Sequence, residues 1–114
     1  MRFLDIDKPI CCDDMIQCIF NLNKLDIKVY HVIKESKYLK ISNIEQIIKK
    51  DRSTIQRSIK RLVKCGLCRR KTNNLSKGGY YYTYQICEDD KIKKNIEKCI
   101  DKWYKIMKEL LNEY

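Results

Sequence analysis

Cys65 and Cys68 form a C-x-x-C pair, the pattern in this sequence that most directly suggests a metal or redox site. Such a pair can bind zinc or form a redox-active disulfide. A structural zinc ion needs four ligands, however, and no second pair has this spacing, since Cys11 and Cys12 are adjacent. We therefore expect no metal and no cofactor, and expect all seven cysteines to pack as small apolar side chains.

Catalytic arrangements of other kinds are absent from the sequence. The single histidine, His31, lies in a predicted helix without a nearby acidic pattern, and there is neither a glycine-rich phosphate loop nor a nucleophile motif. A chain of 114 residues is also too short for a multi-domain enzyme. We expect a protein that is not an enzyme.

The N-terminus carries acidic residues where a signal peptide would be apolar, and no apolar run approaches the ~18 residues that span a bilayer. We expect a cytoplasmic protein with no membrane partner. Its odd number of cysteines makes a complete disulfide framework improbable, so the thiols should be reduced.

The basic residues are a second chemical signal, and they are unevenly distributed. Residues 1–36 carry five basic and six acidic side chains, residues 37–79 carry thirteen and two, and residues 80–114 carry seven and seven. The middle third therefore has a net charge of +11, against +10 for the whole chain. A basic segment between nearly neutral flanks is typical of a surface that binds a polyanion.

Apolar periodicity predicts helices before and within this basic segment. A first helix should begin at residues 7–9, where proline suits the first turn, and a second should cover residues 25–33. Residues 38–41 could be a short strand or a turn. Ser42 and Glu45 have the spacing of a capping box, which predicts a short third helix.

A fourth helix should begin after Asp51, a side chain that can cap it, and end near Gly66, which tolerates left-handed backbone. Its predicted buried stripe is Ile55, Ile59, Leu62 and Val63. At 100° per residue, the cations of this helix fall mainly on the opposite side. Its outer face should therefore be positively charged.

Two β-strands should follow, over residues 67–73 and 80–87, with Gly78 and Gly79 permitting the turn between them. Tyrosines recur through the second strand. Because side chains alternate along a strand, one set should pack on the helices and the other should face outward. The sequence predicts a basic hairpin.

Two short helices, the second with a cationic outer face, followed directly by a basic hairpin form the arrangement of a winged helix-turn-helix. In STIQRSIKRLVKCGLCRRK and YYYTYQI, the sequence resembles the recognition helix and wing of archaeal TrmB-like and MarR-like transcriptional regulators. The resemblance spans roughly residues 38–87. Its most specific positions are Leu62, Gly66, Leu67 and Arg70. We expect no counterpart of the large C-terminal effector domain of sugar-sensing TrmB proteins, so we do not carry over a carbohydrate ligand, and the effector is unknown.

The fourth helix fits the major groove of duplex DNA, where residues near its N-terminus approach base edges and longer cations reach phosphates. The predicted base-reading residues are Ser53, Thr54, Gln56 and Arg57. The predicted phosphate contacts are Arg52, Lys60, Arg61 and Lys64. The wing residues Arg69, Arg70, Lys71 and Lys77 should reach the flanking backbone or minor groove, which agrees with what the resemblance implies.

The C-terminal segment has the pattern of a long amphipathic helix that starts at Asp89 or Asp90. Its apolar residues recur at spacings of three and four, as in a coiled-coil seam. The predicted dimer interface is Ile92, Ile96, Cys99, Ile100, Trp103, Met107 and Leu110. We expect a homodimer, which the resemblance also implies; alternatively, this helix packs wholly on the first one.

The sequence therefore predicts a mainly α fold with a small β-hairpin wing (α+β). A winged helix-turn-helix DNA-binding domain should cover residues 1–88, and a C-terminal dimerisation helix should cover 89–114 within the same compact unit. The predicted function is sequence-specific regulation of transcription by a homodimer bound to double-stranded DNA. Two alternatives stay open: a metal- or redox-sensing repressor that uses Cys65 and Cys68, and a winged helix that binds other proteins.

Overall fold

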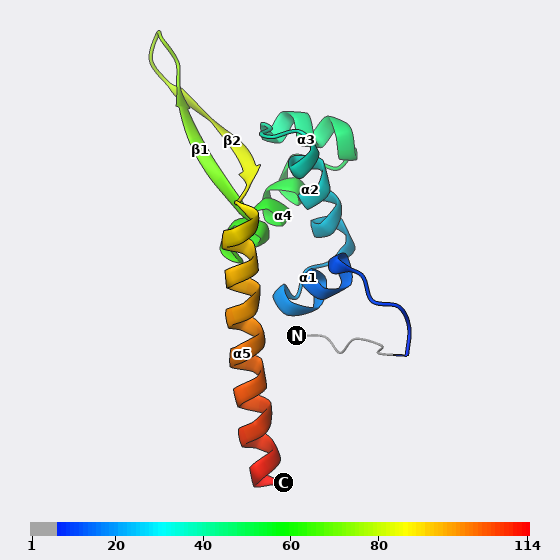
Figure 1. Ribbon diagram of the computed structural model, residues 1–114. Coiled ribbons are helices and arrows are strands. Elements are labelled where there is room, and N and C mark those ends of the chain that lie inside the picture. Colours follow the sequence, from blue (N-terminus) through cyan, green and yellow to red (C-terminus); the bar gives the residue numbers. More distant parts are fainter. Residues whose placement is uncertain (1–6) are drawn as a thin grey trace. The chain divides into compact units, whose positions relative to one another are not determined.

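The computed structural model describes residues 7–114 as five helices and a two-stranded antiparallel sheet (Figure 1). In chain order the elements are α1 (Cys12–Phe20), α2 (Lys24–Glu35), α3 (Ile41–Ile48), α4 (Arg52–Lys64), β1 (Cys68–Asn74), β2 (Tyr80–Ile86) and α5 (Asp89–Glu113). The mainly α architecture with a hairpin is confirmed. Contacts group α1 with α5 in one compact unit and place residues 22–87 in another. The sequence-based prediction instead places the first helix in the winged-helix domain of residues 1–88.

Residues 22–87 share an apolar core to which α2, α3, α4 and the wing contribute. α2 begins at Asn23, whose side-chain oxygen accepts a hydrogen bond from the backbone N–H of Asp26 at 2.8 Å. The almost fully buried apolar side chains are Leu22, Val29, Ile33, Ile44, Ile55, Leu62 and Leu67. Because they come from every helix of this unit, their burial fixes α4 against α2 and α3.

α3 begins two residues earlier than the Ser42–Glu45 pattern predicts, so that capping prediction is wrong. The side chain of Asn43 instead accepts from the backbone N–H of Lys40 at 3.1 Å. The cause lies just upstream, where Leu39 exchanges backbone hydrogen bonds of 2.9 and 2.8 Å with Tyr84 of β2. The chain turns into the helix directly after this bridge.

α4 is capped as predicted, since Asp51 accepts from the backbone N–H of Thr54. It ends before Gly66, whose φ of 84° is left-handed. Val63 was predicted to be buried and is instead 40% exposed. The buried face of α4 is centred between Ile55 and Ser58, which leaves Val63 beyond its edge.

β1 and β2 pair antiparallel, with Cys68 opposite Ile86 and Asn74 opposite Tyr80. The turn between the strands contains two left-handed glycines, Gly78 and Gly79, with φ of 92° and 84°. Tyr84 near the base of the wing is buried, whereas Tyr80 near the tip is 61% exposed. Distance along the strand, as well as alternation, therefore decides which tyrosines are buried.

In the other unit, α1 begins at Cys12, later than the predicted start at residues 7–9. The carboxylate of Asp14 accepts from the backbone N–H of Cys11 at 3.1 Å and forms a cap there. α5 is preceded by Glu88, which makes no side-chain cap, so the predicted capping by Asp89 or Asp90 is wrong. These two acids lie in the first turn, where their negative charges interact favourably with the positive end of the helix dipole.

α1 and α5 contact each other, and each contributes buried apolar residues. Ile92 and Ile96, one turn apart on α5, are buried, whereas every residue from Ile100 to Tyr114 is exposed. None of the helices found within residues 7–114 combines the length and apolarity required to cross a membrane.

Candidate nucleic-acid interface

The outer face of α4 presents a row of exposed polar and cationic side chains. Its exposed members are Arg52, Ser53, Gln56, Arg57, Lys60 and Lys64. Ile55, Ile59 and Leu62 are buried on the opposite face, so the helix cannot rotate without exposing its apolar stripe. The core therefore fixes the direction in which the cations point.

Asp51 organises the N-terminal end of this face. Its carboxylate accepts hydrogen bonds from the hydroxyls of Ser53, at 2.5 Å, and Thr54. These hydrogen bonds, the one from Ser53 foremost, lower the pKa of Asp51 from 3.8 to about 2. Nη2 of Arg57 in turn donates to Oγ1 of Thr54 at 3.4 Å. Three of the predicted base-reading residues are thus linked in one hydrogen-bonded chain.

Arg61 differs from the other cations of α4 because its guanidinium pairs with a buried carboxylate. It makes a salt bridge with Asp26 of α2, with Nη2 2.8 Å from Oδ1, and Nε donates to both carboxylate oxygens. The hydroxyl of Ser58 donates to the same carboxylate at 2.6 Å. Burial alone would raise the pKa of Asp26, but the hydrogen bonds from Arg61 and Ser58 lower it overall. Asp26 is fully buried and charged, so this placement gives Arg61 a structural partner and does not support its predicted phosphate contact.

Asp26 is a residue that the apolar periodicity overlooked. Two signals mark it in the sequence. It lies three residues after Asn23, the spacing of a capping box, and its carboxylate accepts from the Asn23 N–H at 3.0 Å. It also interrupts the apolar spacing between Leu22 and Val29, a position at which an acid needs a buried cationic partner.

The wing divides its cations between two faces. Alternation along β1 puts Arg69 and Lys71 on one face and Arg70 on the other, and all three are exposed. Cζ of Arg70 lies 4.1 Å from the ring centroid of Tyr82, a cation–π contact. Lys77 is exposed in the turn between the strands.

The C-x-x-C thiols lie where the thiolate form is disfavoured. Burial raises the pKa of Cys65 and raises that of Cys68 to about 12, with the buried thiol of Cys87 adding to the second shift. The thiolate is the form that binds metals and attacks disulfides. Over residues 7–114, no group of three His, Cys, Asp or Glu side chains is arranged to hold a metal ion. These surroundings weigh against the sensor alternative.

A helix pair, α3 and α4, followed directly by the hairpin β1–β2 defines a winged helix-turn-helix protein. Residues 16–88 match the model of a family described as the sugar-specific transcriptional regulator TrmB. The chain belongs to this family of transcriptional regulators, which are not enzymes, so the resemblance found in the sequence is confirmed.

The chain is similar to archaeal proteins over most of its length. It is 38% identical over 101 residues to the uncharacterised protein MJ1503 of Methanocaldococcus jannaschii, covering 89% of this chain and 76% of that protein. A solved structure of a possible transcriptional regulator from Methanosarcina mazei has 30% identity and a TM-score of 0.79, covering 94% of this chain and 91% of the other. A mutant MarR of E. coli in complex with operator DNA has 13% identity and a TM-score of 0.52, covering 76% and 61%. The last likeness shows the fold alone.

Proposed function

We propose that this protein regulates transcription by binding specific sequences of double-stranded DNA as a homodimer. The observation that carries the proposal is the exposed cationic face of α4, which the buried stripe holds in a fixed direction. Glu45 and Asp51 are the only acidic residues among residues 37–79. This surface therefore attracts the phosphate backbone, and α4 has the dimensions to enter the major groove.

Each side chain of this face has a role that follows from its position. Residues at the N-terminal end of a recognition helix approach base edges, so Ser53, Thr54, Gln56 and Arg57 are assigned to base reading. Arg52, Lys60 and Lys64 are assigned to phosphates, together with the wing cations Arg69, Arg70, Lys71 and Lys77. Arg61 is assigned to holding α4 on α2.

The apolar stripe of α5 supports the homodimer. Ile100, Trp103, Met107 and Leu110 follow one another at spacings of three and four, and each is 37–53% exposed. A long exposed apolar stripe on a helix is typical of a protein–protein interface, and this spacing suits a second helix of the same kind. A symmetric pair would place two α4 helices roughly 10 base pairs apart, so the operator should be a pseudo-palindrome.

Selection of bound fragments from genomic DNA, followed by fluorescence anisotropy on the selected duplex, tests this function. The affinity should fall steeply as salt is raised, because binding releases counterions from the phosphates. Disrupting either half of the pseudo-palindrome should weaken binding. Absence of binding at low ionic strength, or affinity that does not change with salt, would exclude the proposed function and favour a winged helix that binds proteins.

A further inference from the structure

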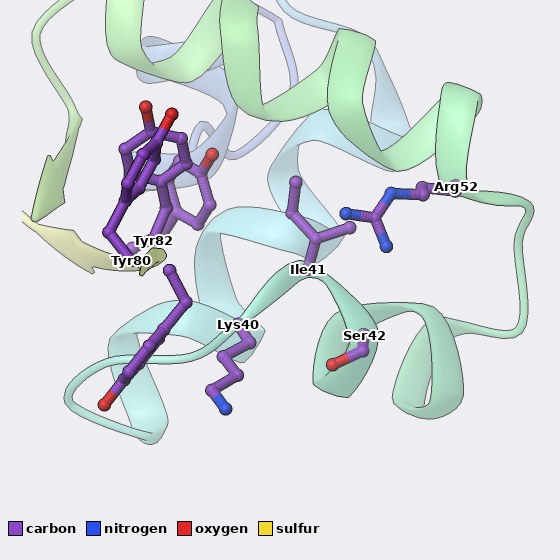
Figure 2. A pocket seen from close by; sticks show the side chains of 8 residues that line it. Lys40, Ile41, Ser42, Arg52, Tyr80 and Tyr82 are labelled. Atoms are coloured by element: carbon purple, nitrogen blue, oxygen red, sulfur yellow. The ribbon is translucent and has the colours of Figure 1, made fainter. Parts of the chain in front are cut away.

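A pocket of about 290 Å³ lies between the first turn of α3, the start of α4 and β2 of the wing (Figure 2). All of these elements belong to the unit formed by residues 22–87. The volume is close to the lower limit of about 300–1,000 Å³ for small-molecule sites. The pocket therefore has room for one small ligand.

The polar side chains of the pocket select an anion. Arg52 supplies one cation, Ser42 supplies a hydroxyl, and Lys40 supplies a second cation whose Nζ lies 4.3 Å from the centroid of the Tyr81 ring. Among the described residues that line the pocket there is no carboxylate. Figure 2 shows the guanidinium of Arg52 directed toward Ile41 in the interior of the pocket. A guanidinium in this position can donate two parallel hydrogen bonds to a phosphate.

The remaining wall is aromatic, formed by tyrosines of β2. The rings of Tyr80 and Tyr82 lie 5.3 Å apart between centroids, at a tilt of 57°. Arg70 already covers a face of Tyr82, whereas Tyr80 is 61% exposed. A hydrogen bond with Tyr82 raises the pKa of Tyr80 above its ordinary value of 10, and a phenol is neutral near pH 7 even at that ordinary value. Tyr80 thus offers an uncharged aromatic surface on which a planar ring can stack.

We propose that this pocket binds a nucleotide, with the base stacked on Tyr80 and the phosphate held by Arg52, while Lys40 beside Tyr81 adds positive charge to the wall. A nucleotide combines the two chemistries that the walls provide, a planar heteroaromatic ring and a compact anion. Aromatic side chains interleaved with cations are the usual means by which proteins bind single nucleotides of a strand. The source is either a free mononucleotide or an unpaired nucleotide at a DNA end.

The position of Arg52 links this pocket to the proposed DNA-binding face. Arg52 is the first residue of α4 and an assigned phosphate contact, so a nucleotide in the pocket competes with duplex DNA for the same guanidinium. This step rests on the proposed function. Nucleotide binding itself does not, because it is measured without duplex DNA.

Titration of the full chain with adenosine 5′-monophosphate, followed by calorimetry and by NMR shifts of the tyrosine rings, tests the site. Binding should be saturable and tighter than that of adenosine or of inorganic phosphate alone. Tyr80→Ala should weaken it roughly tenfold or more, since stacking on one ring is worth about that factor. Arg52→Gln should also weaken it, because it removes the charge-assisted hydrogen bonds to the phosphate. Tyr38→Ala is the matched control, because Tyr38 is 62% exposed and does not line the pocket, and it should bind as the parent does.

A short single-stranded oligonucleotide provides the second arm. Tyr80-dependent binding of the mononucleotide identifies a free nucleotide as the ligand, and Tyr80-dependent binding of the oligonucleotide alone identifies a DNA end. Two results would overturn the proposal. One is equal affinity for adenosine monophosphate and inorganic phosphate. The other is that Tyr80→Ala changes the affinity for neither adenosine monophosphate nor the oligonucleotide. If the parent chain binds the nucleotide but does not bind duplex DNA, the result counts against the proposed function and still supports the pocket assignment.

Discussion

Arg61 of α4 and Asp26 of α2 form a bidentate ion pair, in which the carboxylate is fully buried and the arginine side chain is 40% exposed. This pair joins the helix that carries the assigned base-reading residues to a helix that carries none of them. Its energy therefore contributes to the orientation of α4 as well as to the stability of the fold.

Replacing Arg61 with alanine should lower the free energy of unfolding, because the buried Asp26 would lose its countercharge. Breaking a buried pair costs about 3–5 kcal/mol, and the partial exposure of Arg61 places the expected loss near the lower end. Chemical denaturation at one protein concentration measures it. Arg57→Ala, an exposed arginine of the same helix, is the control and should change stability by less than about 0.5 kcal/mol. Equal losses for the two variants would contradict the structural role of Arg61.

Arg57→Ala should instead reduce sequence discrimination. Loss of an arginine that reads a guanine edge should reduce the difference between cognate and altered operators by about 1–3 kcal/mol. Lys77→Ala, in the wing turn, should weaken binding to all sequences alike and decrease the salt dependence. Anisotropy titrations on a set of single-base operator variants separate these outcomes. If both substitutions affected every sequence equally, Arg57 would not read bases.

Stability should fall on acidification below about pH 4. The pKa values of Asp26 and Asp51 are lowered from 3.8 in the folded protein, that of Asp51 to about 2. A lowered folded-state pKa adds stability that is fully present above the unfolded-state value and is lost as the pH falls through the folded-state value. Denaturation curves between pH 2 and 5 should show this loss, and Asp26→Asn should make the pH dependence shallower. Asp101→Asn, at an exposed position of α5, should leave the dependence as it is.

The proposed homodimer should dissociate when a charge is placed on the apolar stripe of α5. Leu110→Asp puts a carboxylate at a position that is 53% exposed in the single chain and buried in the proposed dimer. Lys105→Asp is the control on the opposite side of the helix. Sedimentation equilibrium at micromolar concentration should find a dimer for the parent and the control, and a monomer for Leu110→Asp. Trp103 fluorescence should shift to longer wavelength on dissociation. A monomeric parent chain would exclude this assembly.

The thiols should differ in reactivity according to burial. Cys11 and Cys12 are exposed, whereas Cys68 is buried and its pKa is raised to about 12. Alkylation near pH 7, read by mass spectrometry, should modify the first two well before Cys68.

Replacing Cys65 and Cys68 together with serine should leave DNA affinity the same under reducing and oxidising conditions, apart from some loss of stability. Oxidation-dependent release of DNA by the parent alone would restore the sensor alternative.

Local signals account for the parts of the fold that the sequence predicted well. Asp51 and Gly66 mark the two ends of α4 because a cap and a left-handed residue act within a few positions of themselves. Gly78 and Gly79 mark the wing turn for the same reason. The start of α3 was missed because a bridge between Leu39 and a strand over forty residues away determines it.

The charge pattern of the sequence could not show which cations of α4 pair within the protein and which face outward. Arg61 and Lys60 are neighbours in a basic segment, and only the tertiary fold brings Asp26 to one of them. The pocket was equally beyond prediction, because its walls come from α3, α4 and β2. The alternating tyrosines were apparent in the sequence, but the cations that face them were not.

If α4 reads bases as proposed, the hydrogen bonds that Asp51 accepts also influence which bases it prefers. With their protons directed to the carboxylate, the hydroxyls of Ser53 and Thr54 could act in the groove only as acceptors, and one lone pair of Thr54 already accepts from Arg57. Lone pairs complement the exocyclic amino groups of adenine and cytosine and repel the carbonyl oxygens of thymine and guanine. The operator positions that face these two residues should therefore carry adenine or cytosine, a preference set by an aspartate that need not touch a base itself.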